Sequence, residues 1–325
     1  MRFPELSDIE EAAGRLKGEA VRTPLIENAA LNRLVRGRVY IKPEGLQRTG
    51  SFKFRGAWNR ISRLDADSAP GGVVAYSSGN HAQGVAAAAQ RVGLAAVIVM
   101  PSDTPRIKQE NTRALGAEVV LYDRATENRE AIGRELAETR RAVLVPPYDD
   151  FHVISGQGTA GLEMLEDLAP KGLVLSSLLV CCGGGGLVAG MATAFAAKSP
   201  STRVYAVEPE DFDDTRRSLL LGKRERNEPG QRSICDALMA PEPGEITFSI
   251  NRRLLAGGLS VSDAEVRAAM RFTFRELKLV VEPGGAVALA ALLSGQVDAQ
   301  DRVTGLVLSG ANVDPALYSE IIRPA

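Results

Sequence analysis

The chain has 325 residues, of which 45% are hydrophobic and 24% are charged. This length allows about two domains of ordinary size, and the composition excludes a disordered or collagen-like chain. Lysine and arginine total 39 against 40 aspartate and glutamate residues, so the formal net charge is −1. A nearly neutral chain with no basic stripe lacks the charge pattern of nucleic-acid-binding proteins, so we expect no nucleic acid partner.

Cysteine and histidine are rare, at three and two residues. Cys181, Cys182 and Cys235 contain no Cys-x-x-Cys pair, and their odd number argues against a disulfide framework. The N-terminus is charged and interrupted by Pro4, so it does not resemble a signal peptide. No apolar run reaches the ~18–20 residues that span a bilayer. We therefore expect a soluble, cytoplasmic protein with no membrane partner.

Short apolar segments alternate with helical patterns, which predicts parallel strands joined by helices. The predicted strands are 39–42, 72–77, 95–100, 118–122, 142–145, 174–181, 203–207 and 303–308. Their Val, Ile and Leu content without alternation is typical of strands covered on both faces. Capping-box patterns at Ser7-x-x-Glu10 and Ser262-x-x-Glu265 predict two helix starts. Further helices are expected after Ser51, Asn80, Thr104, Thr126, Gly158, Gly186 and Gly284. The polar stretch 211–232 is expected to be a surface loop.

Lys53 lies between Phe52 and Phe54, just inside an expected helix start. The positive end of the helix dipole and partial burial both disfavour an ammonium group, so the pKa of Lys53 should fall. A neutral amine is the form that attacks an aldehyde. A lysine that simply extends from an amphipathic helix explains the same pattern, and this segment alone leaves both interpretations open.

Small polar residues follow two predicted strands, in the segment 77–81 and at Ser309. Hydroxyl and backbone N–H groups at such a turn bind carboxylates and phosphates well. Ordinary helix capping explains Ser309 equally well when that segment is taken alone.

Four consecutive glycines, 183–186, follow an apolar strand and open a helix. Without Cβ atoms the backbone can wrap a phosphate, and the helix dipole attracts the anion. The spacing Gly184-x-Gly186-x-x-Ala189, with Glu208 placed 22 residues after Gly186, also fits a dinucleotide-binding fingerprint. An NAD(P)-dependent oxidoreductase is therefore an open alternative, although it gives the two preceding segments no role.

In order and spacing these segments resemble one family over nearly the whole chain. It is the pyridoxal-phosphate (PLP) enzymes of the tryptophan-synthase-β fold, in the branch of threonine/serine dehydratases and serine racemases. The matching segments are 51–57, 78–81, 183–186, 281–286 and 309–312. The resemblance implies an α/β fold with two domains of twisted, mostly parallel sheets covered by helices, and PLP in the cleft between them. The large domain would be 1–62 and 150–325, and the small mobile domain 72–149.

The resemblance also implies a role for each matching residue. Lys53 would bond to the cofactor aldehyde and then serve as the base at the substrate Cα, while Ser78 would return a proton from the opposite face. Cofactor contacts are implied for Phe52, Lys53, Asn80, Gly183, Gly184, Gly185, Gly186, Leu187, Glu282 and Ser309. Substrate contacts are implied for Ser77, Ser78, Asn80 and His81. Asn80 would donate to the cofactor ring hydroxyl oxygen, and Ser309 would meet the ring nitrogen.

The implied reaction is dehydration and deamination of L-threonine or L-serine to a 2-oxo acid and ammonia. Serine racemase and 3-hydroxyaspartate dehydratase are alternatives, as is a non-catalytic amino-acid binder. Ser78 is typical of racemases, although it could be only a helix cap, and the segment 147–150 is more like threonine dehydratases.

The segment 208–214 resembles the metal loop of racemases and hydroxyaspartate dehydratases. By position, Glu208, the Phe212 carbonyl and Asp214 would bind Mg²⁺ or Ca²⁺, since oxygen ligands suit a hard cation. A solvated acidic loop is the alternative. The family resemblance further implies a homodimer.

Overall fold

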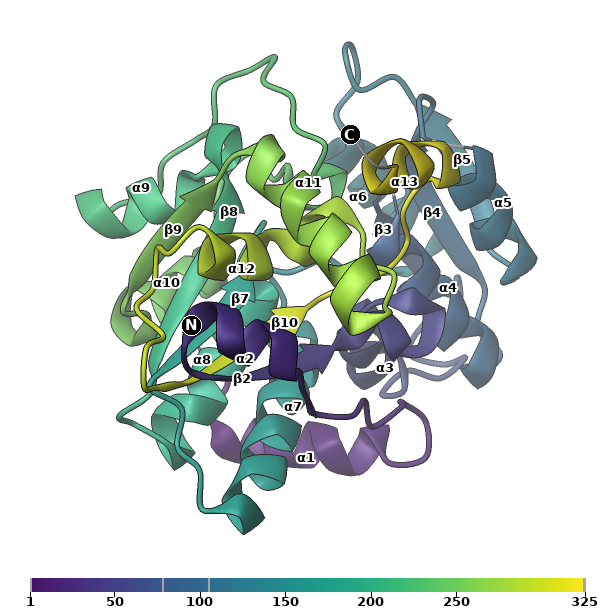
Figure 1. Ribbon diagram of the computed structural model, residues 1–325. Helices are drawn as coiled ribbons and strands as arrows, with labels where there is room; N and C mark the ends of the chain where they lie inside the picture. The colour runs from purple at the N-terminus through teal and green to yellow at the C-terminus, as the bar shows by residue number, and fades with distance from the viewer. Residues whose placement is uncertain (1, 78, 105, 324–325) are drawn as a thin grey trace.

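The computed structural model describes residues 2–77, 79–104 and 106–323. Two sheets organise this part of the chain, with strand orders β1-β2-β10-β7-β8-β9 and β5-β4-β3-β6 (Figure 1). The strands are β1 (Ile26–Glu27), β2 (Arg38–Pro43), β3 (Val73–Tyr76), β4 (Ala96–Pro101), β5 (Glu118–Tyr122), β6 (Val143–Leu144), β7 (Ser177–Cys181), β8 (Arg203–Pro209), β9 (Gly257–Val261) and β10 (Val303–Leu308). Only β1 and β2 pair antiparallel among these strands, so both sheets are mostly parallel.

Helices connect the strands and cover the sheets (Figure 1). They are α1 (Leu6–Leu16), α2 (Ala29–Val35), α3 (Lys53–Ile61), α4 (Asn80–Val92), α5 (Arg106–Ala114), α6 (Arg129–Arg140), α7 (Phe151–Leu168), α8 (Gly186–Lys198), α9 (Asp214–Leu221), α10 (Glu245–Leu254), α11 (Asp263–Phe272), α12 (Pro283–Leu293) and α13 (Pro315–Ile322). Two short turns matter below, the 3-10 turn η5 (Asp236–Leu238) and the π-helical turn η6 (Thr273–Leu277). No described helix is both long enough and apolar enough to cross a bilayer.

The predicted α/β class is confirmed, and each predicted strand forms with small shifts at its ends. Three predictions about local structure are wrong. The helix expected after Gly158 is α7, which begins at Phe151 because Asp150 caps it by accepting the His152 and Val153 N–H groups. The capping box of α1 is made by Glu5 and Asp8, two residues earlier than the pattern at Ser7 indicated. The stretch 211–232 contains α9, whose buried residues are Asp214, Thr215 and Ser218. A helix that buries polar residues shows no apolar periodicity, so the pattern could not reveal it.

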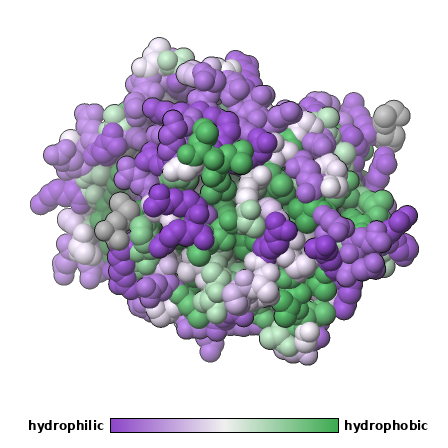
Figure 2. All heavy atoms as spheres, turned by 90° about the vertical axis from the view of Figure 1, so that its left-hand side faces the viewer, coloured by the Kyte–Doolittle hydropathy of each residue, from purple (hydrophilic) through white to green (hydrophobic). Residues whose placement is uncertain are grey.

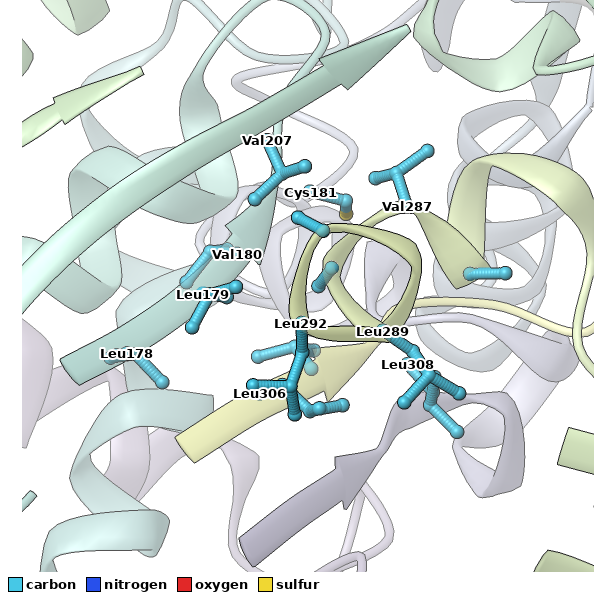
Figure 3. Close-up of a cluster of buried hydrophobic side chains, with 14 of the residues drawn as sticks. Leu178, Leu179, Val180, Cys181, Val207, Val287, Leu289, Leu292, Leu306 and Leu308 are labelled. Carbon is cyan, nitrogen blue, oxygen red and sulfur yellow. The ribbon is translucent and has the colours of Figure 1, made fainter. Parts of the chain in front are cut away.

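The largest hydrophobic core lies around the six-stranded sheet. Figure 3 shows side chains of β7 and β10 meeting those of α12, with Leu179, Leu306 and Leu292 among them. Burial of apolar surface, at ~25 cal/mol per Å², is the dominant favourable term in holding such layers together. This core fixes the carboxyl ends of β7 and β10, which carry the predicted glycine loop and Ser309.

A second core surrounds the four-stranded sheet. It contains Phe54 and Trp58 of α3 together with Ala82 and Val85 of α4. Helix α3 therefore packs into the core of the smaller sheet, although it begins at Lys53 beside the cleft between the sheets.

The surface carries some apolar residues. Leu220 and Leu221 at the end of α9 are 74% and 61% exposed, and Phe274 and Val280 are 44% and 49% exposed. Figure 2 views the side of the molecule on which α9 lies, where apolar patches alternate with polar surface.

Candidate active site

The segments singled out in the sequence converge on one pocket between the two sheets. It opens where strands of both sheets end, which is where ligands bind in α/β folds. Its walls include Phe52, Lys53, Ser77, Asn80, His81, Gly183, Gly184, Gly185, Gly186, Leu187, Glu282 and Ser309. Ser78 lies outside the described residues. Glu208, Phe212 and Asp214 are not among the residues that line this pocket.

Lys53 is the first residue of α3, so its amine lies at the positive end of that helix. Its Nζ donates a hydrogen bond to the Pro147 carbonyl at 2.6 Å and lies 5.2 Å from the centre of the Phe52 ring. Burial lowers the pKa of Lys53 to about 8, in the predicted direction. A substantial fraction of this amine is therefore neutral near physiological pH and able to attack an aldehyde.

The loop before Lys53 is joined directly to the loop that carries Ser309. The Phe52 N–H donates to the Ser309 carbonyl at 3.1 Å, and the Ala311 N–H donates to the Gly50 carbonyl at 2.8 Å. These bonds join two segments that are far apart in sequence, and Phe52 and Ser309 from the two segments line the pocket.

A buried ion network anchors α3 just behind Lys53. The Arg55 guanidinium makes paired hydrogen bonds of 2.8 Å to Glu44 and to Glu163. Lys42 adds a bond of 2.6 Å to the same Glu163 carboxylate. Charges removed from water need such complete pairing, and removing one partner leaves an uncompensated charge. The network therefore restrains the orientation of the helix that presents Lys53.

The glycine loop lies between β7 and α8, with Gly185 in a left-handed conformation at φ +91°. A Cβ on Gly184 would lie 2.3 Å from the Tyr148 ring, so no side chain fits there. The first N–H groups of a helix have no partner inside the helix, and the helix dipole is positive at this end. The loop is therefore a cradle for an anion such as phosphate.

Asn80 and His81 begin α4 and face the same pocket. The Asn80 Nδ2 donates to the Glu282 carboxylate at 2.5 Å. The His81 Nε2 lies 2.9 Å from the Val145 carbonyl, and burial lowers its pKa to about 3. His81 is thus neutral at physiological pH, with its single ring proton on Nε2 facing the Val145 carbonyl. The ring Nδ1 can only accept, so a hydrogen bond from His81 to a substrate carboxylate has to come from its backbone N–H at the start of α4.

Ser309 is buried directly after β10 and lines the pocket together with Cys181. Burial raises the pKa of Cys181 to about 12, so the thiol is neutral. The neighbouring Ser309 hydroxyl is a neutral group that can meet a ring nitrogen without forcing it to take up a proton.

Three charged pocket residues escaped the sequence analysis, Lys108 on α5, Arg129 on α6 and Asp236 on η5. Lys108 pairs with Asp236 at 2.6 Å. Within the described ranges no carboxylate lies within 4.0 Å of Arg129, which stacks over the Tyr76 ring at 5.6 Å. One signal was available in the sequence, because Arg129 follows the N-cap Asn128. A cation at that end of a helix opposes the helix dipole.

The predicted metal residues form a separate, buried group. Both Glu208 oxygens accept backbone N–H groups, from Thr215 at 2.9 Å and Arg216 at 2.8 Å. Asp214 accepts from Asn227 at 2.6 Å through Oδ1, while its Oδ2 is buried without a protein partner. Across the described ranges no cluster of three or more His, Cys, Asp or Glu side chains is arranged as a metal site. The loop offers two carboxylates and a backbone carbonyl instead.

The whole chain has known relatives. The family model "Pyridoxal-phosphate dependent enzyme" matches residues 16–310. The chain belongs to this family. It is 44% identical to L-threo-3-hydroxyaspartate ammonia-lyase of Pseudomonas sp over 323 residues, which cover 99% of this chain and 100% of the relative.

Two solved structures extend the family assignment to the fold. A threonine deaminase from T.th. superimposes with a TM-score of 0.90 at 45% identity, and the match covers 96% of this chain and 99% of that one. Maize serine racemase superimposes with a TM-score of 0.92 at 35% identity, and the match covers 98% and 97%. The resemblance stated from the sequence is therefore confirmed.

The oxidoreductase alternative finds no support. The family model that matches residues 16–310 is that of pyridoxal-phosphate dependent enzymes, and in a dinucleotide fold Glu208 would have to reach a ribose hydroxyl. Glu208 is instead fully buried with both oxygens bonded to backbone N–H groups.

The polar groups that line the pocket match the polar groups of pyridoxal phosphate. The glycine loop, which a Cβ would fill, suits the phosphate, and Lys53 suits the aldehyde. Asn80 offers an N–H donor and Ser309 a hydroxyl on other walls. These are the polar groups that such a cofactor needs for orientation.

Proposed function

We propose that the protein is a PLP-dependent ammonia-lyase that converts L-threonine and L-serine to a 2-oxo acid and ammonia. The observation that carries the proposal is a partly buried lysine with lowered pKa, Lys53, in the same pocket as a glycine anion cradle. Threonine deaminase among the solved relatives supports this reaction class.

In this proposal bound PLP acidifies the Cα–H of an attached amino acid and allows the β-hydroxyl to leave. The Lys53 amine accepts the Cα proton, a role suited to a base with a pKa near 8. Ser77, through its hydroxyl, and Asn80 and His81, through their backbone N–H groups at the start of α4, orient the substrate carboxylate. The β-hydroxyl leaves as water, and water later replaces the amino group, so the net products are a 2-oxo acid and ammonia.

The test follows products with L-threonine and L-serine as substrates. We expect one 2-oxo acid and one ammonia for each substrate consumed, and none from Lys53→Ala. Lys198→Ala, a surface lysine paired with Glu10, is the control and should leave the rate unchanged. Bound amino acid without turnover in wild type would mean a binding protein, and D-serine as the main product would mean a racemase. Racemase activity would give Ser78 the second proton-transfer role.

A second candidate substrate is 3-hydroxyaspartate. Arg129 lines the pocket with no carboxylate partner within the described ranges, so a substrate with a second carboxylate has a cation to meet. The 44% identical relative from Pseudomonas sp is named for this substrate.

Arg129→Gln tests this candidate. We expect kcat/KM for L-threo-3-hydroxyaspartate to fall by about 10- to 100-fold, the range for losing a charge-assisted hydrogen bond, while that for L-serine changes little. Arg124→Gln is the matched control, since Arg124 lies in the adjoining cavity and pairs with Asp103 at 2.8 Å. Equal losses for both substrates would contradict a role in substrate choice.

We also propose that Glu208, the Phe212 carbonyl and Asp214 hold Mg²⁺ or Ca²⁺. The buried Asp214 Oδ2 without a protein partner supports this, since a buried carboxylate oxygen needs a donor or a cation. Either ion should raise the melting temperature after dialysis against a chelator, and Asp214→Asn should abolish the rise. A rise of equal size in Asp214→Asn would refute the site.

Three further proposals concern the whole chain. We propose that 72–149 is a small mobile domain that closes on substrate against a large domain of 1–62 and 150–325.

We propose a homodimer, which exposed apolar residues such as Phe274 and Val280 would favour. We propose a cytoplasmic location, supported by three free cysteines. Sedimentation analysis tests the dimer, and fractionation of the source cells tests the location.

A further inference from the structure

The Asn312 side chain connects three of the segments that surround the pocket. Its Nδ2 lies 2.7 Å from the Thr49 carbonyl, in the loop before Lys53, and 2.7 Å from the Asn80 Oδ1. The Asn80 Nδ2 in turn lies 2.5 Å from the Glu282 Oε1. A continuous chain of hydrogen bonds therefore runs from Asn312 through Asn80 to Glu282.

The donors and acceptors give this chain a direction. An amide NH₂ group has two N–H donors and no acceptor, and Asn312 directs both donors at oxygen atoms. Asn80 must therefore turn its oxygen toward Asn312 and its NH₂ toward Glu282. If the Asn80 amide were reversed, two NH₂ groups would face each other and an amide oxygen would face a carboxylate.

The surrounding backbone packs closely against these side chains, and no Cβ fits at two of its glycines. A Cβ on Gly50 would lie 2.7 Å from the Asn312 Oδ1, and one on Gly310 would lie 2.3 Å from the Glu282 Oε1. Thr49 adopts a left-handed conformation at φ +59°, although it is not glycine, and its carbonyl accepts from Asn312. Strained backbone of this kind persists only where its surroundings hold it.

We propose that Asn312 is a positioning residue that fixes the amide orientation of Asn80, so that Asn80 keeps an N–H for an acceptor oxygen of the bound cofactor. One Asn80 N–H is bonded to Glu282, and the second remains for the pocket, which Asn80 lines. The inference rests on the proposed PLP-dependent function. It assigns a role to Asn312, which does not line the pocket but sets which end of the Asn80 amide faces Glu282.

Asn312→Asp tests the proposal, because aspartate has nearly the same shape but no N–H. The introduced carboxylate can only accept, so Asn80 should reverse and turn its oxygen toward Glu282. Asn80 then no longer donates to the cofactor, and we expect about tenfold weaker binding of PLP, the effect of one lost hydrogen bond. Asn312→Ala removes the donor without forcing the reversal, and we expect a smaller loss.

Comparing the loss of PLP affinity in the two variants shows whether Asn312 acts through its hydrogen bonds or only through packing. If Asn312 only fills space, Asn312→Ala should weaken PLP binding more than the isosteric Asn312→Asp. Equal or greater loss in Asn312→Ala, or no loss in either, would overturn the proposal. If Asn312→Asp does not fold, Asn312→Ala should still weaken PLP binding relative to Asn28→Ala, and an unchanged affinity would overturn it.

A spectroscopic readout tests the same point without catalysis. Burial and Asp236 on η5 raise the pKa of Glu282 to about 7, while Lys108 on α5, the Asn80 donor and Lys53 on α3 lower it. With the Asn80 oxygen facing it in place of the N–H, Glu282 should hold its proton to still higher pH. We expect the pH midpoint of the bound-PLP absorption spectrum to rise by about one unit in Asn312→Asp. An unchanged midpoint would overturn the proposal.

Asn28→Asp is the matched control. Asn28 also donates through Nδ2 to a backbone carbonyl, that of Glu276 at 3.1 Å, away from the pocket. We expect wild-type PLP affinity and spectrum from Asn28→Asp. If wild type itself binds no PLP, the proposed function fails, whereas a failure confined to the variants refutes only the role of Asn312.

Discussion

At the scale of single residues, Lys53 combines two properties that oppose each other. Its position inside the protein destabilises the ammonium form, and that same destabilisation makes the amine reactive. The sequence showed this combination because Lys53 lies among apolar residues at a helix start. The roles of Lys108, Arg129 and Asp236 could not be predicted in this way, because packing of distant elements brings them to the pocket.

The lowered pKa of Lys53 predicts a pH dependence of stability in the cofactor-free protein. Between pH 8 and 10.5 the unfolded chain keeps a proton on this lysine while the folded protein releases it, so stability rises with pH. The destabilisation is complete below pH 8 and absent above 10.5, and it amounts to about 3 kcal/mol. Urea unfolding, measured once below pH 8 and once above pH 10.5, should show that the free energy of unfolding of wild type rises by this amount relative to that of Lys53→Met. A difference between the two proteins that does not change with pH would refute the prediction.

At the scale of secondary-structure elements, strand ends and glycine turns were the most predictable features. The loop between β7 and α8 follows from an apolar strand, four glycines and a helix start, which are all local signals. Helix α9 and strand β9 were missed because their sequences lack such local signals. Strand β9 contains two glycines and is only half-buried, so it lacks a continuous apolar run.

The glycine loop gives a prediction at this scale. In Gly184→Ala the new Cβ meets the Tyr148 ring at 2.3 Å, so either the ring or the loop must move. Overpacking of this kind costs about 1–3 kcal/mol. We expect a lower melting temperature and at least roughly tenfold weaker PLP binding, measured by titration of the cofactor-free protein.

Gly14→Ala is the control for this substitution. Gly14 lies in α1 with no atom within 4 Å of the Cβ position. Alanine is the better helix former by up to about 1 kcal/mol, so we expect equal or higher stability and unchanged PLP binding. Wild-type PLP affinity in Gly184→Ala would show that the loop tolerates side chains and is not the cradle described here.

At the scale of the whole molecule, the family fold could be predicted from five short segments, but the packing of α3 could not. Helical periodicity shows that α3 has an apolar face without showing which sheet receives it. The structure places that face in the core of the four-stranded sheet, so α3 connects Lys53 to the segment proposed to move.

The ion pair between Lys108 and Asp236 links the segment 72–149 to the rest of the chain, and it leads to a prediction about the opening of the proposed mobile domain. It joins α5, within 72–149, to η5 in the rest of the chain at 2.6 Å. Asp236→Asn should favour the open form, and a partly exposed pair of this kind changes equilibria by only a few-fold. We expect faster hydrogen exchange in 72–149 and a KM raised a few-fold. Glu118→Gln breaks the Arg140–Glu118 pair inside the same segment and should change neither, so equal effects would contradict the prediction.

The most direct test concerns the bond between Lys53 and the cofactor. Holoenzyme is treated with borohydride, digested and analysed by peptide mass spectrometry. We predict that the mass of the reduced cofactor is added to the peptide that contains Lys53 and to no other lysine peptide. An unmodified Lys53 peptide, or a cofactor attached to a different lysine, would contradict the account.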